Sequence, residues 1–340
     1  YYGYFFVTHD QELLGNRFTA NLNHQISGRE NRLVAGFEIT DLDFSRARGF
    51  RRRIPLAASD SVDPLTPIPG SYGRRELSGI SPTDIDTRAL FFEDAFDLTD
   101  NLTLIGALRY EELDLARRNF NDLGVLESSG FTRDFDWVSV RLGAVAQVSD
   151  DVSAYAQYSD GKDPVNANIF LVNSEENLDL TDAKQWELGL KGSWQDGRTV
   201  ATIASFDIER DAVLERIGVD SAASIGGRHS SGLELSSSFN PTPNWRVGAN
   251  ASLIEAEFKR STNFVTFAGN RPPNVADMTG NLWTSYSEVA GLPLEIGGSV
   301  QYIDDRFGDN ANQVRLSSYT LVDLFAAWSA ADYSITARIS

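Results

Sequence analysis

Arginine is concentrated in one polar stretch of a chain that is otherwise acidic. The sequence has 30 Lys and Arg residues against 48 Asp and Glu residues, which gives a formal net charge of −18. A guanidinium group is planar and donates paired hydrogen bonds to planar oxygen groups, so this stretch suits an oxygen-rich, anionic ligand. The alternatives are contact with surface phosphates and simple solvation. The candidate contacts are Arg46, Arg48, Arg51, Arg52, Arg53, Tyr72, Arg74 and Arg75.

Aromatic residues in other polar stretches suit stacking on a ligand of this kind. Phe170, Phe264 and Phe267 each lie in such a stretch. A packed cluster of loop side chains is the alternative interpretation of the same three rings. We therefore predict a binding function, with these rings as further candidate contacts.

Catalysis and metal binding are not predicted. His9, His24 and His229 are scattered along the sequence, and there is no Cys to complete a transition-metal site. The adjacent carboxylates at 111–112 and 175–176 are interpreted as solvated strand ends rather than as an acid and base pair. We expect no enzyme activity, no metal site and no covalently bound cofactor.

The composition narrows the class of protein further. The sequence pI of about 4.6 argues against nucleic acid as a partner, because basic patches supply most of that affinity. No run of 18 apolar residues is present, so no transmembrane helix is predicted. Aromatic residues make up 11% of the 340 residues, and a membrane interface would use them well. The chain opens on a strand-like stretch rather than on a signal peptide.

Apolar and polar residues alternate with a period of two over most of the chain, which is typical of β-strands. In residues 186–194 the even positions are Trp, Leu, Leu, Gly and Trp, and the odd positions are Glu, Gly, Lys and Ser. Segments 17–26, 32–41, 138–148 and 245–253 alternate in the same way. About fifteen such strands are predicted, many of them longer than the usual five or six residues.

The connections between these strands alternate in length. Short turns are predicted at 27–31, 99–101, 149–151, 195–197, 240–244, 288–293 and 330–332. Alternating short and long connections are typical of an antiparallel up-and-down transmembrane β-barrel, with periplasmic turns and extracellular loops. The predicted extracellular loops are 45–87, 118–134, 160–183, 211–227, 259–275 and 307–317.

The charges indicate which face of the predicted strands meets lipid. Lys191 on the lipid face would cost roughly 2–4 kcal/mol at the bilayer midplane, so the apolar face is assigned to lipid. Trp186 and Trp194 on that face are about 26 Å apart along an extended strand, which matches an apolar band with an aromatic girdle at each edge. The charged residues expected to line a wet lumen or to contact a plug are Arg109, Arg141, Lys191 and Arg246.

Several stretches resemble TonB-dependent outer-membrane receptors of the ferric-siderophore branch. The stretch "ENLDLTDAKQWELGLKGSWQDGRTVATIASFDIERDAV" (176–213) resembles the family's Lys-Gln-Tyr/Trp-Glu-x-Gly-x-Lys strand, its Asp-Gly-Arg turn and its Phe-Asp-Ile strand end. "GRHSSGLELSSSFNPTPNWRVGANASLIEAEF" (227–258) resembles its next hairpin, and 270–286 and 301–328 resemble its later strands. Four stretches in this order are a specific indication of the family, whereas the first 150 residues fit only through strand pattern and the "LTLIGALRYEELD" strand (102–114).

This resemblance implies a barrel of about 22 strands with a globular plug. We therefore expect residues 1–340 to be part of the barrel domain, without the plug, the TonB box, about seven of the strands and the final aromatic-ended strand. The implied location is the outer membrane of a Gram-negative bacterium. The implied partners are the TonB energy-coupling protein, outer-membrane lipids and lipopolysaccharide, and no nucleic acid.

The function implied by the resemblance is capture of a ferric siderophore at the cell surface and its import with energy from TonB. The same receptor class with another cargo is the first alternative, namely cobalamin, haem, a saccharide or another metal chelate. A haem receptor would be expected to offer histidine ligands, which the three scattered histidines do not favour. A passive porin and an outer-membrane lipase or protease are alternatives of other classes.

Overall fold

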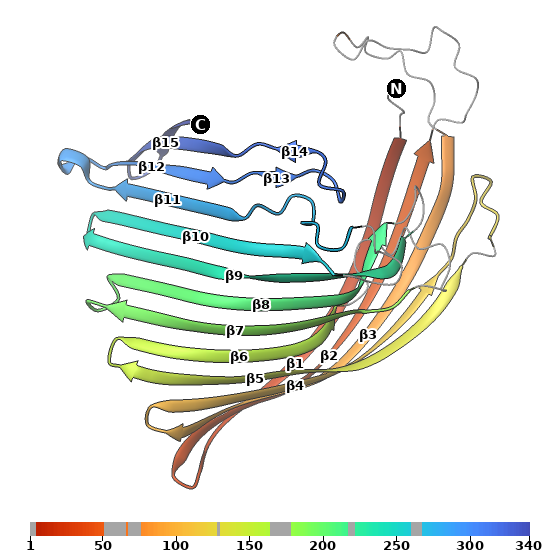
Figure 1. Cartoon of the computed structure of the whole chain (residues 1–340), viewed down its shortest axis with the longest axis horizontal. Helices are drawn as coiled ribbons and strands as arrows, with labels where there is room; N and C mark the ends of the chain where they lie inside the picture. The colour runs from red at the N-terminus through yellow and green to blue at the C-terminus, as the bar shows by residue number, and fades with distance from the viewer. Residues whose placement is uncertain are drawn as a thin grey trace.

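One antiparallel sheet of fourteen strands organises the chain (Figure 1). Each strand pairs with the next along the chain, except that β12 pairs with β15 because β13 and β14 form a separate hairpin between them. The predicted all-β, up-and-down antiparallel architecture is thus confirmed, with fourteen sheet strands where about fifteen were expected. The computed structural model describes residues 5–50, 66, 76–127, 130–163, 178–216, 222–259 and 267–340.

The strands are long because their alternating sequence supports pairing over many residues; β1 and β2 have 22 residues each. The first eight are β1 (Phe5–Ile26), β2 (Arg29–Phe50), β3 (Glu76–Thr99), β4 (Leu102–Arg117), β5 (Phe131–Ser149), β6 (Val152–Asp163), β7 (Thr181–Trp194) and β8 (Thr199–Arg216). The others are β9 (Ala222–Thr242), β10 (Trp245–Phe258), β11 (Met278–Tyr286), β12 (Leu294–Ile303), β13 (Arg306–Phe307), β14 (Arg315–Leu316), β15 (Tyr319–Ser329) and β16 (Ser334–Ile339).

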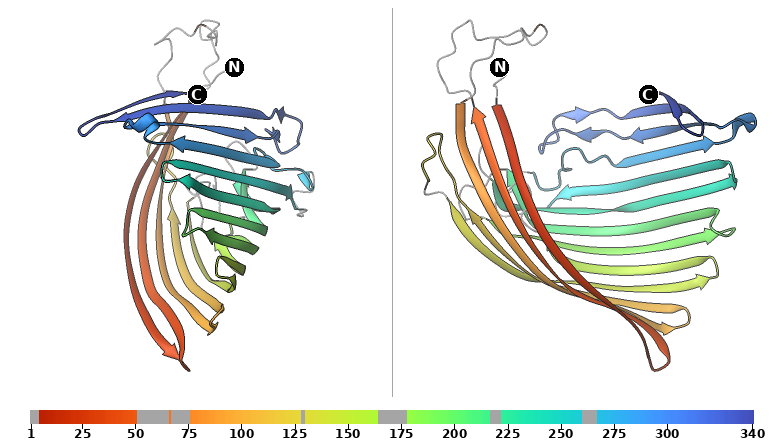
Figure 2. Two further views of the ribbon diagram at one scale, coloured as in Figure 1. Left: turned by 90° about the vertical axis from the view of Figure 1, so that its left-hand side faces the viewer. Right: turned by 180° about the vertical axis from the view of Figure 1, so that it is seen from behind.

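The sheet curves into an open trough (Figure 2). Among the described residues, β1 pairs only with β2 and β16 pairs only with β15, so these two strands form the edges of the trough. We call its concave side the inner face and its convex side the outer face. No helix in the described part of the chain is both long and apolar enough to cross a membrane.

Short turns gather at one end of the trough and long connections at the other, as predicted (Figure 1). The β1–β2 turn has only two residues, Ser27 and Gly28, with φ of 52° and 78°. Positive φ at both central positions matches a type I′ turn, whose twist suits a hairpin. We refer to the two ends as the short-turn end and the long-connection end.

The strands continue further into the predicted loops than the sequence indicated. In the region predicted as loop 45–87, β2 runs to Phe50 and β3 begins at Glu76. In the region predicted as loop 211–227, β8 runs to Arg216 and β9 begins at Ala222. Strand pairing therefore extends into both of these stretches. The physical reason is that a strand is held by backbone hydrogen bonds to its neighbours, which persist where the apolar and polar alternation has stopped.

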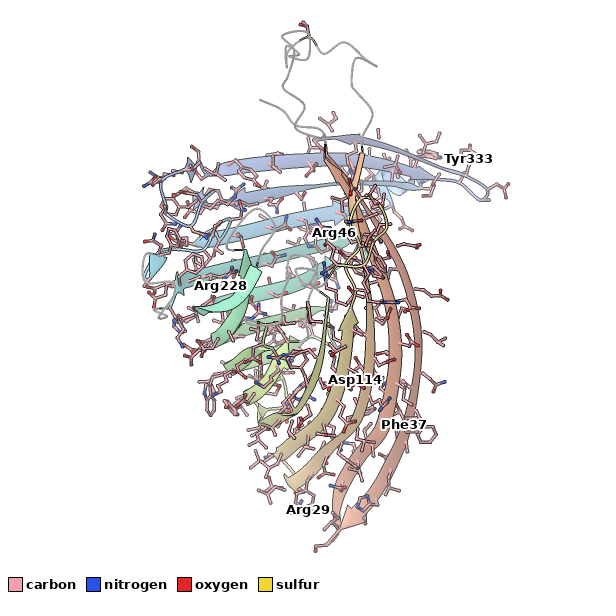
Figure 3. The ribbon with its side chains drawn as sticks, turned by 90° about the vertical axis from the view of Figure 1, so that its right-hand side faces the viewer. Arg29, Phe37, Arg46, Asp114, Arg228 and Tyr333 are labelled. Carbon is pink, nitrogen blue, oxygen red and sulfur yellow. The ribbon has the colours of Figure 1, made fainter. Side chains whose placement is uncertain are left out.

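The outer face is apolar along its middle. Trp186, Leu188 and Leu190 on β7 are all exposed there, as the sequence predicted. Phe18 and Phe37 are directly opposed on β1 and β2 and stack with ring centroids 5.6 Å apart, and Phe37 points away from the concave side (Figure 3). A band of exposed apolar side chains of this kind is the surface that lipid would cover.

On the inner face, five large aromatic rings lie across glycines of the neighbouring strand. In each pair the two residues are directly opposed in register, and a Cβ added to the glycine would come within 3.0 Å of the ring. Because the glycine has no side chain, the ring lies against the sheet instead of projecting from it. The pairs are Gly36 with Phe91, Gly189 with Tyr155, Gly232 with Phe206, Gly248 with Trp283, and Gly297 with Phe325.

Candidate functional site

The inner face carries charged residues that the strand alternation places on one side. Arg109 on β4 and Arg141 on β5 point to the same side as Lys191 on β7, as the sequence predicted. The Lys191 ammonium lies 4.8 Å from the centroid of the Tyr155 ring, and the Tyr155 hydroxyl donates a hydrogen bond of 2.5 Å to Glu187. The inner face is therefore a polar wall opposite the apolar outer face.

A hollow of about 420 Å³ lies in this wall, lined by residues of β1 and of β3 to β7. Its volume is in the range of small-molecule sites. Arginines from three different strands line it beside the ring of Phe91, and Asp163 lies at its edge towards the long-connection end. The arginines are Arg17, Arg109 and Arg141.

Carboxylates on the inner face neutralise the arginines of the hollow. Arg109 lies 2.7 Å from Glu111 and 3.6 Å from Glu38. Arg17 lies 3.9 Å from the same Glu38, and Arg141 pairs with Glu93. Arg17 also stands 4.6 Å above the Phe91 ring, a favourable cation–π distance. The arginines of the hollow are thus held in place by ion pairs, and their charges are balanced by carboxylates.

Two further arginines face each other above the hollow, towards the long-connection end. Arg210 on β8 and Arg228 on β9 are directly opposed in register. Arg210 forms an ion pair with Asp163, while the Arg228 guanidinium lies 5.4 Å from the centroid of Phe258, which is buried. Arg46 on β2 and Arg228 on β9 border the concave side from its two walls (Figure 3).

The outer face at the same end has the opposite charge. Asp41, Asp86, Asp114 and Asp134 are in register across four neighbouring strands, and all four are exposed. At the long-connection end the outer face is therefore acidic, whereas the inner face carries arginines.

An apolar cluster covers part of the inner wall beside the hollow. Leu178 and Leu180, which precede β7, pack on inner-face residues of β4 and β5 and are only 2% and 3% exposed. Trp137 in this cluster is 5% exposed, and its Nε1 has no hydrogen-bond partner among the described residues. The segment 178–180 thus returns to the inner wall and anchors one long connection there.

Two other connections at this end are joined by hydrogen bonds. Asn270 Nδ2 donates to the Asn310 carbonyl oxygen at 2.9 Å, and Asn312 pairs with the backbone of Arg271. Arg315 donates two hydrogen bonds, of 2.9 and 3.0 Å, to the carboxylate of Asp305. These bonds hold the pKa of Asp305 below its usual range.

The histidines and paired acids lie apart from one another. His9 is 5.2 Å from the Phe44 ring, and His229 Nε2 is 2.9 Å from Asp207 on the outer face. The adjacent Glu111 and Glu112 point to opposite faces, because neighbouring residues of a strand alternate. Within the described ranges, no group of three His, Cys, Asp or Glu side chains could hold a metal ion.

Most of the ligand contacts predicted from sequence lie outside the described residues. Arg46 is described, is 8% exposed and lies on the inner face. The backbone carbonyl oxygen of Phe267 accepts a hydrogen bond from the Asn270 N–H at 2.9 Å. Arg48 lies on β2, but its side chain is outside the described part, as are all of the following residues: Arg51, Arg52, Arg53, Tyr72, Arg74, Arg75, Phe170 and Phe264.

Sequence reasoning missed the opposed Arg210 and Arg228. Arg210 lies on the same face of β8 as Phe206 and Ile208, and two apolar neighbours of this kind would have assigned it to the outer face. Their opposition depends on the register between β8 and β9, which the sequence does not specify.

Comparisons with known proteins agree with this architecture. The profile of the family described as "TonB dependent receptor-like, beta-barrel" matches residues 1–340. The metal-pseudopaline receptor CntO of Pseudomonas aeruginosa is 24% identical over 333 residues, which cover 93% of this chain and 44% of that receptor. The ferrichrome outer membrane transporter/phage receptor of Escherichia coli is 26% identical over 206 residues, covering 58% of this chain and 26% of the relative.

Solved structures give the same result for the fold. The siderophore receptor PiuA from Acinetobacter baumannii superimposes with a TM-score of 0.80 at 19% identity, covering 97% of this chain and 51% of the receptor. The ferric-catecholate import receptor Fiu from Escherichia coli has a TM-score of 0.79 at 16% identity, covering 95% of this chain and 49% of the receptor. The chain spans about half the length of these structures.

Proposed function

The chain belongs to the TonB-dependent receptor β-barrel family, and we propose that the protein carrying it captures a ferric siderophore at the cell surface and imports it with energy from TonB. Barrels of this family lie in the outer membrane of Gram-negative bacteria and are transporters rather than enzymes. The iron would arrive already chelated, so the protein itself need not ligate it.

The division between the two faces carries this proposal. An apolar outer face suits lipid, while the inner face offers a hollow of about 420 Å³ lined by ion-paired arginines. A passage that takes up a polar chelate from outside needs both properties. Relatives that match most of this chain are described as a metal-pseudopaline receptor and a ferrioxamine receptor, which supports a metal chelate as cargo.

Haem is less well supported as a cargo. His24 and His229 lie on the outer face, and His9 stands beside Phe44. None of the three is placed with a second histidine that could share a haem iron. Cobalamin, a saccharide or another metal chelate remains an alternative cargo for the same receptor class.

We further propose that additional strands complete the barrel and that a plug fills its lumen. In hydrocarbon every backbone polar group must be paired, so closed barrels rather than open sheets span membranes. The edge of β1 that faces away from β2 has no partner strand among the described residues, and neither has the edge of β16 that faces away from β15. Mass spectrometry of the intact protein tests this, because a mass well above 37.5 kDa with plug peptides is expected, and a mass equal to this chain would contradict it.

Arg46 and Phe267 are proposed as ligand contacts that belong to the described part of the chain. Both lie at the long-connection end, where a ligand from the cell exterior would arrive. The remaining predicted contacts, which lie at the end of β2, in the β2–β3 connection and in the connections after β6 and β10, are proposed on their sequence alone.

Uptake of iron tests the proposed function. Cells that carry the gene, cells that lack it and cells that lack TonB would be given radioactive iron bound to a panel of siderophores. We expect uptake of at least one chelate that requires both the gene and TonB. Uptake that is independent of TonB and rises linearly with concentration would instead indicate a passive porin.

A further inference from the structure

We propose that a groove on the outer face binds the headgroup of a membrane lipid that carries both a phosphate and a primary ammonium group, as a phosphoethanolamine headgroup does. Arg88 would bind the phosphate, and Asp41 and Asp86 the ammonium. The groove has a volume of about 410 Å³ and lies across β1, β2 and β3. It is separate from the inner-face hollow and from the proposed cargo contacts.

Two rows of outer-face side chains form the walls of the groove. Each row has one residue from each of the three strands, and its three residues are in register. Residues 15, 40 and 87 lie between the rows and point their side chains to the inner face, so their backbone forms the floor. The row nearer the long-connection end is Leu14, Asp41 and Asp86, and the row nearer the short-turn end is Asn16, Ile39 and Arg88.

The groove offers one cationic and two anionic side chains that are not engaged elsewhere. Arg88, Asp41 and Asp86 are exposed, and in the described part of the chain no hydrogen bond or ion pair engages any of them. Glu112, which is directly opposite Arg88 on β4, instead accepts a hydrogen bond of 2.9 Å from the Tyr110 hydroxyl. The guanidinium and the two carboxylates of the groove are therefore available to a ligand from the membrane.

The spacing of these charges suits a zwitterion. Arg88 and Asp86 are two residues apart on one strand, which separates their Cα atoms by about 7 Å, and Asp41 is directly opposite Asp86. An arginine binds phosphate oxygens through paired hydrogen bonds, and a primary ammonium donates several hydrogen bonds to carboxylates, as a lysine does. Because only a short ethyl linker separates the two charged groups of phosphoethanolamine, one headgroup can reach both sides of the groove.

Headgroups of other charge fit these side chains less well. A phosphatidylglycerol headgroup would bring its phosphate beside two carboxylates and has no ammonium to offset the repulsion. A phosphatidylcholine headgroup has a quaternary ammonium, which carries no N–H to donate to Asp41 or Asp86. A purely cationic amphiphile would leave the Arg88 guanidinium without an anion. The groove therefore selects a headgroup that supplies both charges together with N–H donors.

The apolar band beside the groove supplies a surface for the acyl chains. Ile39, in the wall of the groove, is 50% exposed. The next row towards the short-turn end holds the stacked rings of Phe18 and Phe37 with Leu90 in register, and Phe37 lies on the convex side of the trough (Figure 3). A lipid whose acyl chains lie on this row has its headgroup at the level of the groove. The site is thus continuous with the surface that lipid covers.

Native mass spectrometry of the intact protein purified in detergent tests this assignment, because it counts the lipids that stay bound. The probes are phosphatidylethanolamine, phosphatidylcholine and phosphatidylglycerol with the same acyl chains. The groove variants are Arg88→Gln and Asp86→Asn. One matched control is Arg118→Gln, which changes an exposed arginine that pairs with Asp84 at 3.2 Å. The other is Asp134→Asn, which changes an exposed aspartate of the same register row on β5, beyond the groove.

We expect phosphatidylethanolamine to bind the native protein roughly tenfold more tightly than the other two lipids, the effect of about one charge-assisted hydrogen bond. Arg88→Gln should weaken the binding of all three lipids, because each has a phosphate. Asp86→Asn should weaken phosphatidylethanolamine roughly tenfold without weakening phosphatidylglycerol, because only the contact with the ammonium is lost. Equal binding of the three lipids to the native protein, or groove variants that behave like their controls, would overturn the assignment.

Competition with lipid A, in forms that carry or lack a phosphoethanolamine group, identifies which lipid supplies the headgroup. Displacement of bound phosphatidylethanolamine only by the form that carries the group would assign the site to lipid A. Displacement by neither form would assign it to phosphatidylethanolamine itself. Equal displacement by both forms would overturn the assignment, because the ammonium would then contribute nothing. None of these measurements involves a cargo, so their outcome is separate from that of the proposed function.

Discussion

Asn312 pairs with the backbone of Arg271 through two hydrogen bonds. The Arg271 N–H donates to Asn312 Oδ1 at 2.9 Å, and Asn312 Nδ2 donates to the Arg271 carbonyl oxygen at 2.8 Å. The two residues belong to different connections at the long-connection end, one before β11 and one before β15. Together with the hydrogen bond from Asn270 to Asn310, the pair therefore joins two loops at the mouth of the inner wall.

Asn312→Asp is expected to loosen both of these loops. The substitution keeps the acceptor but replaces the Nδ2 donor by an oxygen that faces a carbonyl oxygen, and each lost hydrogen bond costs about 1 kcal/mol. Hydrogen exchange should therefore become roughly fivefold to tenfold faster in residues 267–277 and 304–318. Gln313→Glu, one position along, is the matched control and should leave exchange unchanged. Equal exchange in the two variants would contradict the role of Asn312.

The hairpin β13–β14 is expected to lose protection in acid because of Asp305. Arg315 lowers the pKa of this carboxyl by hydrogen bonding to its charged form. A carboxyl whose pKa is lowered in the folded protein stabilises it above the unfolded value of about 4. This stabilisation is lost as the pH falls through the lower, folded pKa.

Hydrogen exchange of residues 304–318, corrected for its intrinsic pH dependence, measures this loss between pH 6 and pH 2. We expect the native hairpin to be better protected than the Asp305→Asn variant at pH 6 and to approach it at the acid end. Parallel curves over the whole range would show that the Asp305 and Arg315 pair contributes nothing to the order of the hairpin.

Gly189→Ala is expected to destabilise the sheet through Tyr155. The added Cβ would come within 3.0 Å of the Tyr155 ring, and moving that ring breaks its hydrogen bond to Glu187 and its contact with Lys191. Overpacking of this kind costs about 1–3 kcal/mol. Gly106→Ala is the control, because a Cβ there has no atom within 4 Å. Urea unfolding in lipid vesicles measures both, and an equal effect would refute the close fit.

Leu188→Lys is expected to oppose membrane insertion. Leu188 is 59% exposed on the outer face, and a lysine facing lipid costs about 2–4 kcal/mol near the midplane. Gln157→Lys places the same charge on the inner face, directly opposite Glu187, and should be nearly neutral. Folding free energies in phosphatidylcholine bilayers compare the two. A larger cost for Gln157→Lys would mean that the faces were assigned the wrong way round.

The architecture was predictable because it repeats a simple pattern. Alternation in segments such as 186–194 gives both the strand and its two faces, so Trp186, Leu188 and Lys191 lie on the predicted sides. The difference between short and long connections fixed the up-and-down order. These features depend on local chemistry that every strand repeats, and one sequence is enough to read them.

The candidate site was less predictable because it depends on register and on returning segments. The opposition of Arg210 and Arg228 follows from how β8 pairs with β9, where the register shifts between Arg210 and Val213. The return of Leu178 and Leu180 to the inner wall is a tertiary contact with no local signal. The arginine-rich stretch after residue 45 drew attention by its composition alone, and most of it lies outside the described residues.

The glycines opposite inner-face rings have a consequence for how this sequence can change. A mutation of Gly189 or Gly248 to any larger residue is accepted only if the ring across from it, Tyr155 or Trp283, becomes smaller in the same lineage. The two positions of each pair should therefore covary among relatives. Because each pair joins two positions at a known distance along the chain, the pairs give reference points for aligning distant relatives. Such relatives have too low an identity to be aligned by residue type alone.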